Sequence, residues 1–418
     1  MTLRQAVPRV LLIAPRDSYR TAPYVAAARK QGIELLIASE GEYALAGSDL
    51  PGLRIDLSNT DASVDVVLAA ASQNPFAAVI GTDDSSVELA AQVSAQLRLP
   101  HNPVEGVRIA RRKDLARAQL VAAGLPAPDY WRVELSQPLD PQLESVQFPC
   151  VIKPVALSAS RGVIRADNRA QLDIALARVR RIVADVPNPA ERETLLIESY
   201  IPGAEVAVEG LLTGGQLEIL AIFDKPDPLE GPFFEETYYV TPSRQSPRRL
   251  EQIAQTVAAA CAAYGLNEGP VHAECRINDE GIWILEVAAR TIGGLCGRLL
   301  RFGTGFGLEE LVLQHALGRR ANVRRAAGGA GVLMIPIPQA GILRRVEGIL
   351  AAQHVPFVEE VVIDVREGYE LVPLPEGSSY LGFIFVRAPS AAEAEAALRQ
   401  AHACLRIVVA PLWKAAAS

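Results

Sequence analysis

The sequence is poor in cysteine, and its cysteines are not arranged to bind a metal or to form a disulfide framework. Among 418 residues there are five, namely Cys150, Cys261, Cys275, Cys296 and Cys404. Their number is odd, they lie far apart, no CxxC pair occurs, and no histidine stands at zinc-finger spacing. Reduced and mostly buried thiols are therefore expected, and the sequence identifies no partner that would make one of them a nucleophile.

Long apolar runs and an excess of basic charge are also missing. No uninterrupted apolar run reaches the ~18 residues of a membrane span, and the start, MTLRQAVPRVLLIAPR, has no small-residue cleavage site after its short apolar core. Lys and Arg number 41 against 48 Asp and Glu, which gives a net charge of −7. These absences argue against a general nucleic-acid binder and against a membrane partner. The hydrophobic content of 50% is ample for a well-buried core. Without a secretory signal or a membrane span, a soluble, cytoplasmic protein is expected.

Strand and helix patterns alternate through the first hundred residues. Apolar β runs are expected at 10–14, 33–39 and 76–82, and amphipathic helices at 23–32, 62–73 and 85–99. This alternation predicts a doubly wound parallel sheet, an α/β domain. The first turn, APRDSY, lacks GxGxxG, so a nicotinamide site is not expected there.

The remainder of the chain predicts mixed α+β structure. A helix over 107–124 leads into proline-rich LPAPDYW, and Gly214-Gly215 marks the turn of a hairpin over 205–226. The expected domains are an N-terminal α/β domain over 1–112, two α+β lobes over 113–203 and 204–327, and a C-terminal α+β block over 328–418.

The segment HAECRINDEGIWILEVAARTIGG, residues 272–294, places glutamates inside two apolar strands. If DEG (279–281) forms a three-residue loop with Gly281 at positive φ, Glu274 lies directly opposite Glu286. Two facing carboxylates repel one another, and a divalent cation such as Mg²⁺ between them removes the repulsion. The alternative is an ordinary hairpin, one residue out of this register, with both acids turned to water.

A second group of polar residues is suited to nucleotide. Lys153 ends the apolar strand VIKP and precedes the small, hydroxyl-bearing loop SASRG (158–162), whose amides could wrap a polyphosphate. Lysines in such strands more often extend to water. Glu198 and Glu205 flank SYIPGA, one positioned for adenine and the other for ribose, and either could equally be a solvated acid at a strand end.

Taken together, this order of residues resembles the ATP-grasp superfamily over residues 100–300, preceded by a pre-ATP-grasp domain. The resemblance implies two α+β lobes that clamp ATP with Mg²⁺ or Mn²⁺. It assigns Lys113, Lys153 and the loop residues Ser158, Ser160 and Gly162 to the phosphates, Glu198 with the backbone of Ser199 and Ile201 to adenine, Glu205 to ribose, and Glu274 and Glu286 to the metal.

Within that superfamily, FDKPDP…FFEETYYVTPS, EVAARTIGG and the last ~90 residues resemble the L-amino acid ligase branch, which includes dipeptide synthetases. The resemblance implies that Lys225 approaches the phosphates and that Glu236 meets a substrate amino group. It implies that Arg290 holds a substrate carboxylate or acyl phosphate, and that the backbone amides of Gly293 and Gly294 donate to the developing oxyanion. A homodimer is the family expectation.

Four positions depart from the family pattern. Ala288 stands where many members have a metal-binding asparagine, which bears on a second Mg²⁺. Gly162 is the only glycine of the phosphate loop, and His272 stands where some relatives carry arginine; His272 is open to a role at the phosphoryl group or to a structural hydrogen bond. Tyr238-Tyr239 replace a histidine expected after Glu236, which should alter the amino-acid pocket.

The sequence therefore predicts an ATP-dependent carboxylate–amine ligase acting on small-molecule amino-acid substrates through an acyl phosphate. The loop 158–162 and the segment 226–236 are the lid candidates. The alternatives are another ATP-grasp ligase, of purine or cofactor biosynthesis, and a non-catalytic ATP-binding protein.

Overall fold

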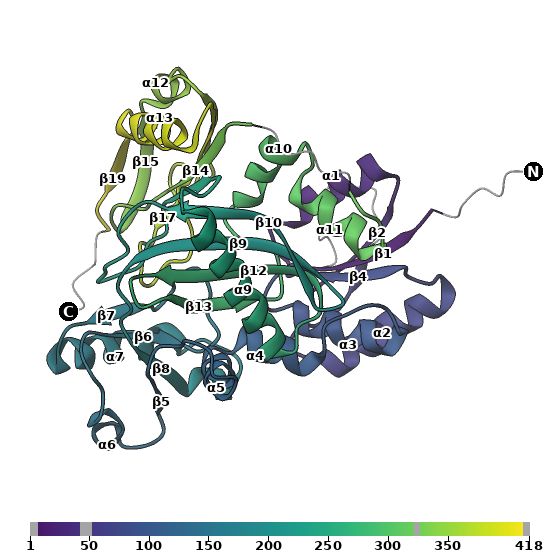
Figure 1. Ribbon diagram of the computed structural model, residues 1–418, viewed down its shortest axis with the longest axis horizontal. Coiled ribbons are helices and arrows are strands. Elements are labelled where there is room, and N and C mark those ends of the chain that lie inside the picture. Colours follow the sequence, from purple (N-terminus) through teal and green to yellow (C-terminus); the bar gives the residue numbers. More distant parts are fainter. Residues whose placement is uncertain (1–6, 42–51, 322–326, 413–418) are drawn as a thin grey trace, which may run out of the picture.

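Four β-sheets form the framework of the protein, and the computed structural model describes residues 7–41, 52–321 and 327–412 (Figure 1). Residues 1–6 lie outside these ranges. They belong to the N-terminal stretch in which no secretion signal is expected. No helix within the described ranges is long and apolar enough to cross a membrane.

The N-terminal sheet has the strand order β3-β2-β1-β4 and lies at the right of Figure 1. Its strands are β1 (Arg9–Ile13), β2 (Glu34–Ser39), β3 (Gly52–Arg54) and β4 (Ala78–Gly81), and its helices are α1 (Thr21–Gln31), α2 (Thr60–Gln73) and α3 (Val87–Leu97). All pairings are parallel, which confirms the predicted parallel sheet. The loop after β1 and the Thr82–Asp84 turn after β4 lie at the carboxyl edge of this sheet, next to the neighbouring lobes.

The single helix predicted over 107–124 is wrong, because the structure has two helices, α4 (Val104–Arg111) and α5 (Lys113–Ala122). Arg112 between them is extended, with φ −101° and ψ 105°. The break is held by two contacts. The backbone N–H of Lys113 donates to Val155 O at 2.8 Å, and the Arg112 guanidinium donates to Asp114 at 2.9 and 2.8 Å.

The first α+β lobe is an antiparallel sheet with the order β5-β8-β6-β7, at the lower left of Figure 1. Its elements are β5 (Tyr130–Glu134), α6 (Leu139–Leu143), β6 (Cys150–Pro154), β7 (Ile164–Ala166), α7 (Arg169–Val183), α8 (Pro189–Arg192) and β8 (Thr194–Ser199). Leucine, alanine and valine side chains of α7 bury its apolar stripe against the sheet. Lys153 of β6 and Glu198 of β8 lie on one face of this sheet, because Lys153 pairs with Leu196.

The second lobe is built on an eight-stranded sheet with the order β13-β12-β9-β10-β11-β14-β18-β16. Its first five strands are β9 (Ala204–Thr213), β10 (Gln216–Lys225), β11 (Tyr238–Thr241), β12 (Glu268–Ile277) and β13 (Ile282–Ala288). The accompanying helices are α9 (Pro247–Tyr264), the 3₁₀ turn η1 (Cys296–Arg298), α10 (Leu299–Thr304) and α11 (Leu308–Ala316). Valine and isoleucine residues of α9 pack on one face of β9, β12 and β13, together with α4 and α5.

The C-terminal block extends this sheet and adds a small one. β14 (Gly329–Ile335), β16 (Val358–Ile363) and β18 (Gly382–Ala388) continue the eight-stranded sheet. The small sheet has the order β17-β15-β19, made of β15 (Gly341–Glu347), β17 (Glu370–Leu371) and β19 (Arg406–Ala410). The helices are α12 (Ile349–Gln353) and the alanine-rich α13 (Ala391–Ala403). The block is thus joined to the second lobe by backbone hydrogen bonds as well as by packing.

Candidate active site

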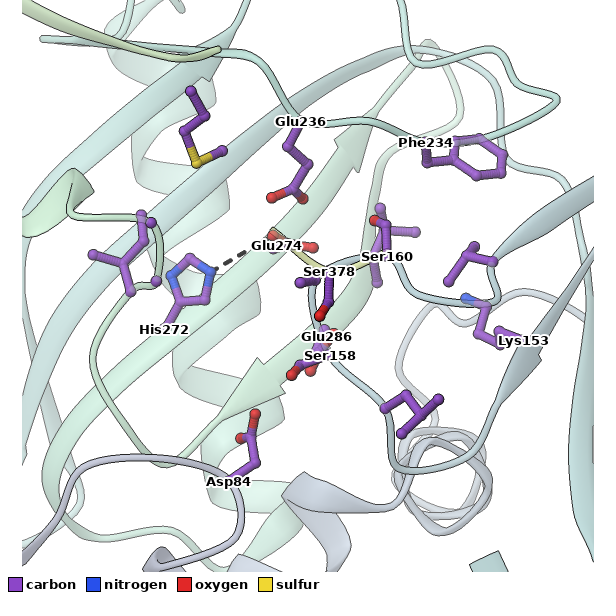
Figure 2. A pocket seen from close by; sticks show the side chains of 18 of the residues that line it. Asp84, Lys153, Ser158, Ser160, Phe234, Glu236, His272, Glu274, Glu286 and Ser378 are labelled. Atoms are coloured by element: carbon purple, nitrogen blue, oxygen red, sulfur yellow. Dashed lines mark ion pairs between the residues drawn. The ribbon is translucent and has the colours of Figure 1, made fainter. Parts of the chain in front are cut away.

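A cavity of about 750 Å³ lies where the N-terminal domain, both lobes and the C-terminal block meet. It brings together the following predicted site residues: Lys113, Lys153, Ser158, Ser160, Glu198, Ser199, Ile201, Glu205, Glu236, His272, Glu274, Glu286, Arg290, Gly293 and Gly294. Gly162 and Lys225 lie just behind its wall. Figure 2 shows Glu236 and Glu274 pointing toward one another, with Lys153 on the opposite side.

Glu274 lies directly opposite Glu286 in the β12–β13 hairpin, as predicted, but not through the predicted loop. Ile277 pairs with Ile282, so the turn has four residues, 278–281, rather than three. A β-bulge then leaves Leu285 unpaired and restores the register at the two acids. Asn278 holds the turn, since its side-chain oxygen accepts from the backbone N–H of Glu280 and Gly281 at 3.0 and 3.1 Å.

The same bulge interrupts the alternation of faces along β13. Ile282 and Ile284 pack in the core, and so does Val287, which strict alternation would place on the other face. The unpaired Leu285 reverses the alternation, so that Leu285 and Glu286 both line the cavity. A buried arginine, Arg117, donates to the Leu285 carbonyl at 2.6 Å and so stabilises the bulge.

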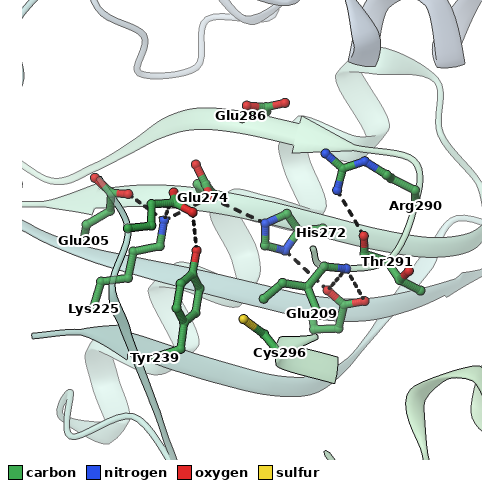
Figure 3. Close-up of polar contacts among 12 residues, drawn as sticks. Glu205, Glu209, Lys225, Tyr239, His272, Glu274, Glu286, Arg290, Thr291 and Cys296 are labelled. Atoms are coloured by element: carbon green, nitrogen blue, oxygen red, sulfur yellow. Dashed lines mark hydrogen bonds and ion pairs between the residues drawn. The ribbon is translucent and has the colours of Figure 1, made fainter. Parts of the chain in front are cut away.

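Lys225 lies at the centre of three carboxylates that line the cavity (Figure 3). Its Nζ donates to Glu205 at 2.7 Å, to Glu236 at 2.6 Å and to Glu274 at 2.9 Å. The pairing of β10 with β9 places Lys225 opposite Glu205, which fixes the ammonium there. All three of its donors are used, so the predicted contact of Lys225 with phosphate requires at least one of these bonds to be exchanged.

Glu236 is the acid of this group that holds a proton most readily. Burial, together with the nearby Glu274 carboxylate, raises the pKa of Glu236 to about 7, even though Lys225 opposes the shift. The Tyr239 hydroxyl donates to it at 2.6 Å. Neutral pH is therefore close to the pKa of Glu236, so this carboxyl group is partly protonated there. Lys225 and His272, by contrast, hold the pKa of Glu274 well below its usual range despite burial.

His272 bridges the acid cluster to the loop that carries Arg290 and the two glycines (Figure 3). Its Nε2 lies 3.6 Å from Glu274 and its Nδ1 3.3 Å from Glu209, its cross-strand neighbour on β9. Burial alone would lower the pKa of His272, but the two carboxylates outweigh it and raise the pKa to about 9. Glu209 is fully buried and also accepts from the Ile292 N–H at 3.1 Å, so it holds the 290–294 loop to the sheet.

Glu198 forms the opposite arrangement on the nucleotide side, where one acid holds two cations. Lys153 donates to Glu198 at 2.6 Å and Arg117 at 2.7 Å. Although burial alone would raise it, these cations lower the pKa of Glu198 to about 2. Both carboxylate oxygens of Glu198 are engaged by these cations, and its contact with adenine stays a prediction.

The phosphate loop adopts a left-handed backbone over several residues. Ala159 and Ser160 have φ of 54° and 53°, and Gly162 has φ of 75°. At Gly162 a Cβ would lie 2.8 Å from Pro154, which explains the one glycine of this loop. Lys113 points to the same region, donating to Leu157 O at 2.8 Å and lying 3.6 Å from Glu286.

Both predicted lid segments contact other parts of the chain across the cavity. The Gly162 N–H donates to Pro375 O of the C-terminal block at 2.9 Å, and the Arg165 N–H donates to Pro232 O at 2.9 Å. Phe233 forms an isolated bridge with Ile164 of β7, so the segment 226–236 runs from the second lobe to the first. Movement of these segments in turnover stays a prediction.

Arg290 and the glycine pair contact the N-terminal domain. The Arg290 guanidinium donates to Asp84 at 2.8 Å and to the Thr291 carbonyl at 3.0 Å. Gly294, with φ of 60°, donates its N–H to the Tyr19 hydroxyl at 2.9 Å. An oxyanion at this amide would have to replace the tyrosine oxygen.

The charged residues of the site that were not predicted include these four: Arg117, Arg276, Glu209 and Asp84. Arg276 is buried and donates to Glu205 at 3.0 Å and to Ile201 O at 3.0 Å, and it also donates to Leu229 O of the segment 226–236. The sequence pattern could have indicated two of the four. Arg276 shares a strand face with Glu274 on β12, and Glu209 shares one with Glu205 on β9. Arg117 lies in an ordinary polar helix pattern, which gives no such signal.

The acidic residues fit a divalent cation. Within the described residues, oxygens of Glu205, Glu236 and Glu274 lie within 4.8 Å of one another. The side chain of Glu286, opposite Glu274, makes no hydrogen bond to any described residue and has only the 3.6 Å ion pair with Lys113. Carboxylate oxygens that are crowded together and open to a cavity are the ligands that Mg²⁺ and Mn²⁺ prefer.

Comparison with known protein families gives two matches. Residues 146–298 match the ATP-grasp domain, and residues 333–410 match the L-amino acid ligase C-terminal domain 2. The first match includes the phosphate loop, the three-acid cluster and Arg290. The second includes the C-terminal strands that border the cavity.

Individual relatives agree with these matches at low identity. The crystal structure of an L-amino acid ligase from Bacillus licheniformis superposes with a TM-score of 0.85 and 26% identity, over 97% of this chain and 100% of that one. Dapdiamide A synthase of Enterobacter agglomerans is 24% identical over 56% of this chain, and alanine–anticapsin ligase of Bacillus subtilis is 23% identical over 55%. The chain spans about half the length of these two relatives, 55% and 52%.

Proposed function

Because the chain belongs to the ATP-grasp superfamily of ligases, we propose that it joins the carboxylate of an amino acid to the amine of a second substrate at the expense of ATP. The observation that carries the proposal is the pair of facing glutamates, Glu274 and Glu286, at the edge of a cavity with lysines across from it. Facing acids favour a cation, and nearby lysines favour the phosphates that would share it.

The reaction has two steps. A carboxylate oxygen of the first substrate attacks the γ-phosphorus of ATP and ADP leaves, giving an acyl phosphate. The amine of the second substrate then attacks the acyl carbon, and phosphate leaves as the amide forms. A free carboxylate lacks a good leaving group, so phosphorylation is what makes the second step possible.

The nucleotide side of the cavity would neutralise phosphate charge. Lys113 donates to Leu157 O beside the phosphate loop, and Lys153, which lines the same cavity, is fixed by Glu198 through a 2.6 Å hydrogen bond. Fixed cations near a transferring phosphoryl group act by positioning and by electrostatic stabilisation. Glu205 and the strand end at Ser199 and Ile201 would bind the nucleoside.

The acidic side would hold the metal and the first substrate. Glu274 and Glu286 would hold a Mg²⁺ ion, which when bound supplies charge neutralisation and orientation to the phosphates. Glu236, with a pKa of about 7, would accept a hydrogen bond from the substrate ammonium. Arg290 would hold the carboxylate undergoing phosphorylation, and His272 would keep Glu274 ionised and oriented.

Water must be excluded, because an acyl phosphate hydrolyses readily. The loop 158–162 and the segment 226–236 would serve as lids, since each contacts the opposite side of the cavity through backbone hydrogen bonds. Excluding water also strengthens the electrostatic contacts inside. Tyr239 and Tyr380 at the cavity wall would shape the amino-acid pocket.

The proposal is tested by measuring ADP release over all pairs of the proteinogenic L-amino acids, with mass spectrometry of the products. The expected result is ADP release that depends on a specific pair, with a product lighter than the sum of its substrates by one water. Nucleotide binding without ADP release from any pair would instead support a non-catalytic ATP-binding protein. The C-terminal match at 333–410 disfavours a purine or cofactor ligase.

A further inference from the structure

Two adjacent residues of the N-terminal domain, Tyr19 and Arg20, reach into the cavity beside Gly293. A Cβ built on Gly293 would lie 3.2 Å from the Tyr19 hydroxyl and 3.4 Å from Arg20 Nη2. Arg20 is only 8% exposed, although it precedes helix α1 at the domain surface. Its guanidinium lies over the Tyr19 ring at 4.8 Å, which restricts both side chains.

Most of the Arg20 guanidinium has no partner among the described residues. Nη1 pairs with Asp83, but the buried Nε has no hydrogen-bond partner, and Nη2 makes no hydrogen bond to any described residue. The Tyr19 hydroxyl accepts from the Gly294 N–H, which leaves its own proton free to donate. The Nη2 donors of Arg20 and the Tyr19 hydroxyl lie beside Gly293 in the cavity lining without an acceptor among the described residues, so the arrangement favours an anionic ligand.

Arg290 adds a third set of donors to the same place. Its Nε is held by Asp84 and its Nη1 by the Thr291 carbonyl, while its Nη2 is not bonded to any described residue. The two adjacent aspartates after β4 thus hold one arginine each. Asp83 pairs with Arg20 of the same domain, and Asp84 pairs with Arg290 across the domain boundary. Each aspartate fixes its guanidinium in place without using all of its donors.

We propose that Arg20, with Tyr19, binds the free α-carboxylate of the second, amine-donating substrate. The inference rests on the proposed function and assigns the carboxylate end of its second substrate to these two residues. In an α-amino acid the carboxylate is two bonds from the amine nitrogen. The anchor must therefore lie close to the point of attack, which is where Gly293 and Gly294 place Arg20.

The carboxylate dependence can be measured with amino-acid amides. An L-amino-acid amide keeps the amine but has no α-carboxylate, so it can serve only as the amine-donating substrate. Wild-type protein is expected to use the free amino acid with a kcat/KM roughly 10- to 100-fold above that of its amide, as lost charge-assisted hydrogen bonds would give.

The variant Arg20→Gln tests the residue itself. It is expected to raise the KM of the second amino acid by roughly 10- to 100-fold, to leave the KM of ATP unchanged, and to remove the preference over the amide. Arg20→Lys keeps the charge beside Asp83 and should recover part of that preference, whereas a merely structural role would not restore it. Tyr19→Phe should show a smaller loss of the same kind.

Arg29→Gln is the matched control, because Arg29 is exposed on the same helix, away from the cavity. It is expected to match wild type in every parameter. Equal use of acid and amide by wild-type protein, or an equal loss on both substrates in Arg20→Gln, would overturn the inference and leave the ligase proposal intact. Absence of ADP release from wild-type protein with every pair would overturn the ligase proposal, and the inference with it.

Discussion

The two sides of the cavity carry buried charge clusters of opposite composition. On the nucleotide side one acid, Glu198, holds two cations, Arg117 and Lys153. On the metal side one cation, Lys225, is surrounded by Glu205, Glu236 and Glu274. The first cluster has positive charge to spare and favours an anion, whereas the second has negative charge to spare and favours a cation.

The pairing within each cluster also explains why these charged side chains can be buried. A buried ion is costly unless its partners satisfy it, and each cluster has a central ion whose bonding capacity is filled. The excess charge is left at the cavity edge, at Lys153 on one side and at Glu236 and Glu274 on the other. MgATP would complement both edges at once, since it carries a cation and a polyphosphate.

The largest expected effect comes from breaking the positive cluster. Glu198→Gln leaves Arg117 and Lys153 buried without a carboxylate and should lower the free energy of unfolding by about 3–5 kcal/mol. With a pKa of about 2 against 4.5 unfolded, Glu198 stabilises the protein above pH 4.5, and its contribution is lost as the pH falls toward 2. The loss should therefore be full at pH 7 in urea unfolding.

Exposed Glu193, on the same lobe, provides the control for that experiment. Glu193→Gln should change the free energy of unfolding by less than about 0.5 kcal/mol. Equal stabilities of Glu198→Gln and Glu193→Gln would mean that the positive cluster does not depend on its acid.

Breaking the negative cluster should have an effect that metal can reverse. Lys225→Met leaves three carboxylates facing one another and should destabilise the protein in EDTA by about 3 kcal/mol. Saturating Mn²⁺ should then restore about 2–3 kcal/mol, because an ion can take the place of the ammonium. Melting temperatures with and without Mn²⁺ measure this, and an equal response of wild type and variant contradicts the arrangement.

Removing the facing acid should affect catalysis more than folding. Glu286→Gln is expected to lower ADP formation by at least about 10²-fold, because one charge that orients the metal and phosphates is lost. The melting temperature of this variant should stay near that of wild type, since the side chain of Glu286 makes no hydrogen bond to any described residue. Glu280→Gln, in the exposed turn of the same hairpin, should retain full activity. Near-wild-type ADP release from Glu286→Gln would defeat the metal assignment.

The smallest expected effect is a pH dependence at His272. Its pKa is about 9 in the folded protein against 6.5 when unfolded, so its stabilising charge is fully present below pH 6.5 and is lost as the pH rises through 9. His272→Gln should therefore melt roughly 2–4 °C below wild type at pH 6. The two should converge above pH 9, and a constant difference from pH 6 to pH 10 would contradict the ion pairs with Glu209 and Glu274.

Sequence patterns predicted the facing glutamates correctly because two errors cancelled. The turn has one residue more than expected, and the bulge at Leu285 shifts the register back. A bulge changes no residue type, so alternation cannot reveal it. Here it depends on Arg117, which is far away in sequence and reaches the Leu285 carbonyl only in the folded protein.

The remaining differences have similar causes. The helix break at Arg112 depends on a hydrogen bond from Lys113 to Val155, a contact between distant segments. The strand–helix alternation of the N-terminal domain was predictable because burial on one face imposes a period along the chain. Arg20 and Asp84 have no period of their own, and only the meeting of separate domains places them in the cavity.

The central claim is that Glu274 and Glu286 together hold a cation that nucleotide shares. Its most direct test is a Mn²⁺ titration in the presence of ADP, followed by electron paramagnetic resonance, on wild type and on the double variant Glu274→Gln/Glu286→Gln. The account predicts nucleotide-dependent Mn²⁺ binding by wild type and a loss of at least about 10-fold in affinity in the variant. Equal affinities for Mn²⁺ in the two proteins would contradict it.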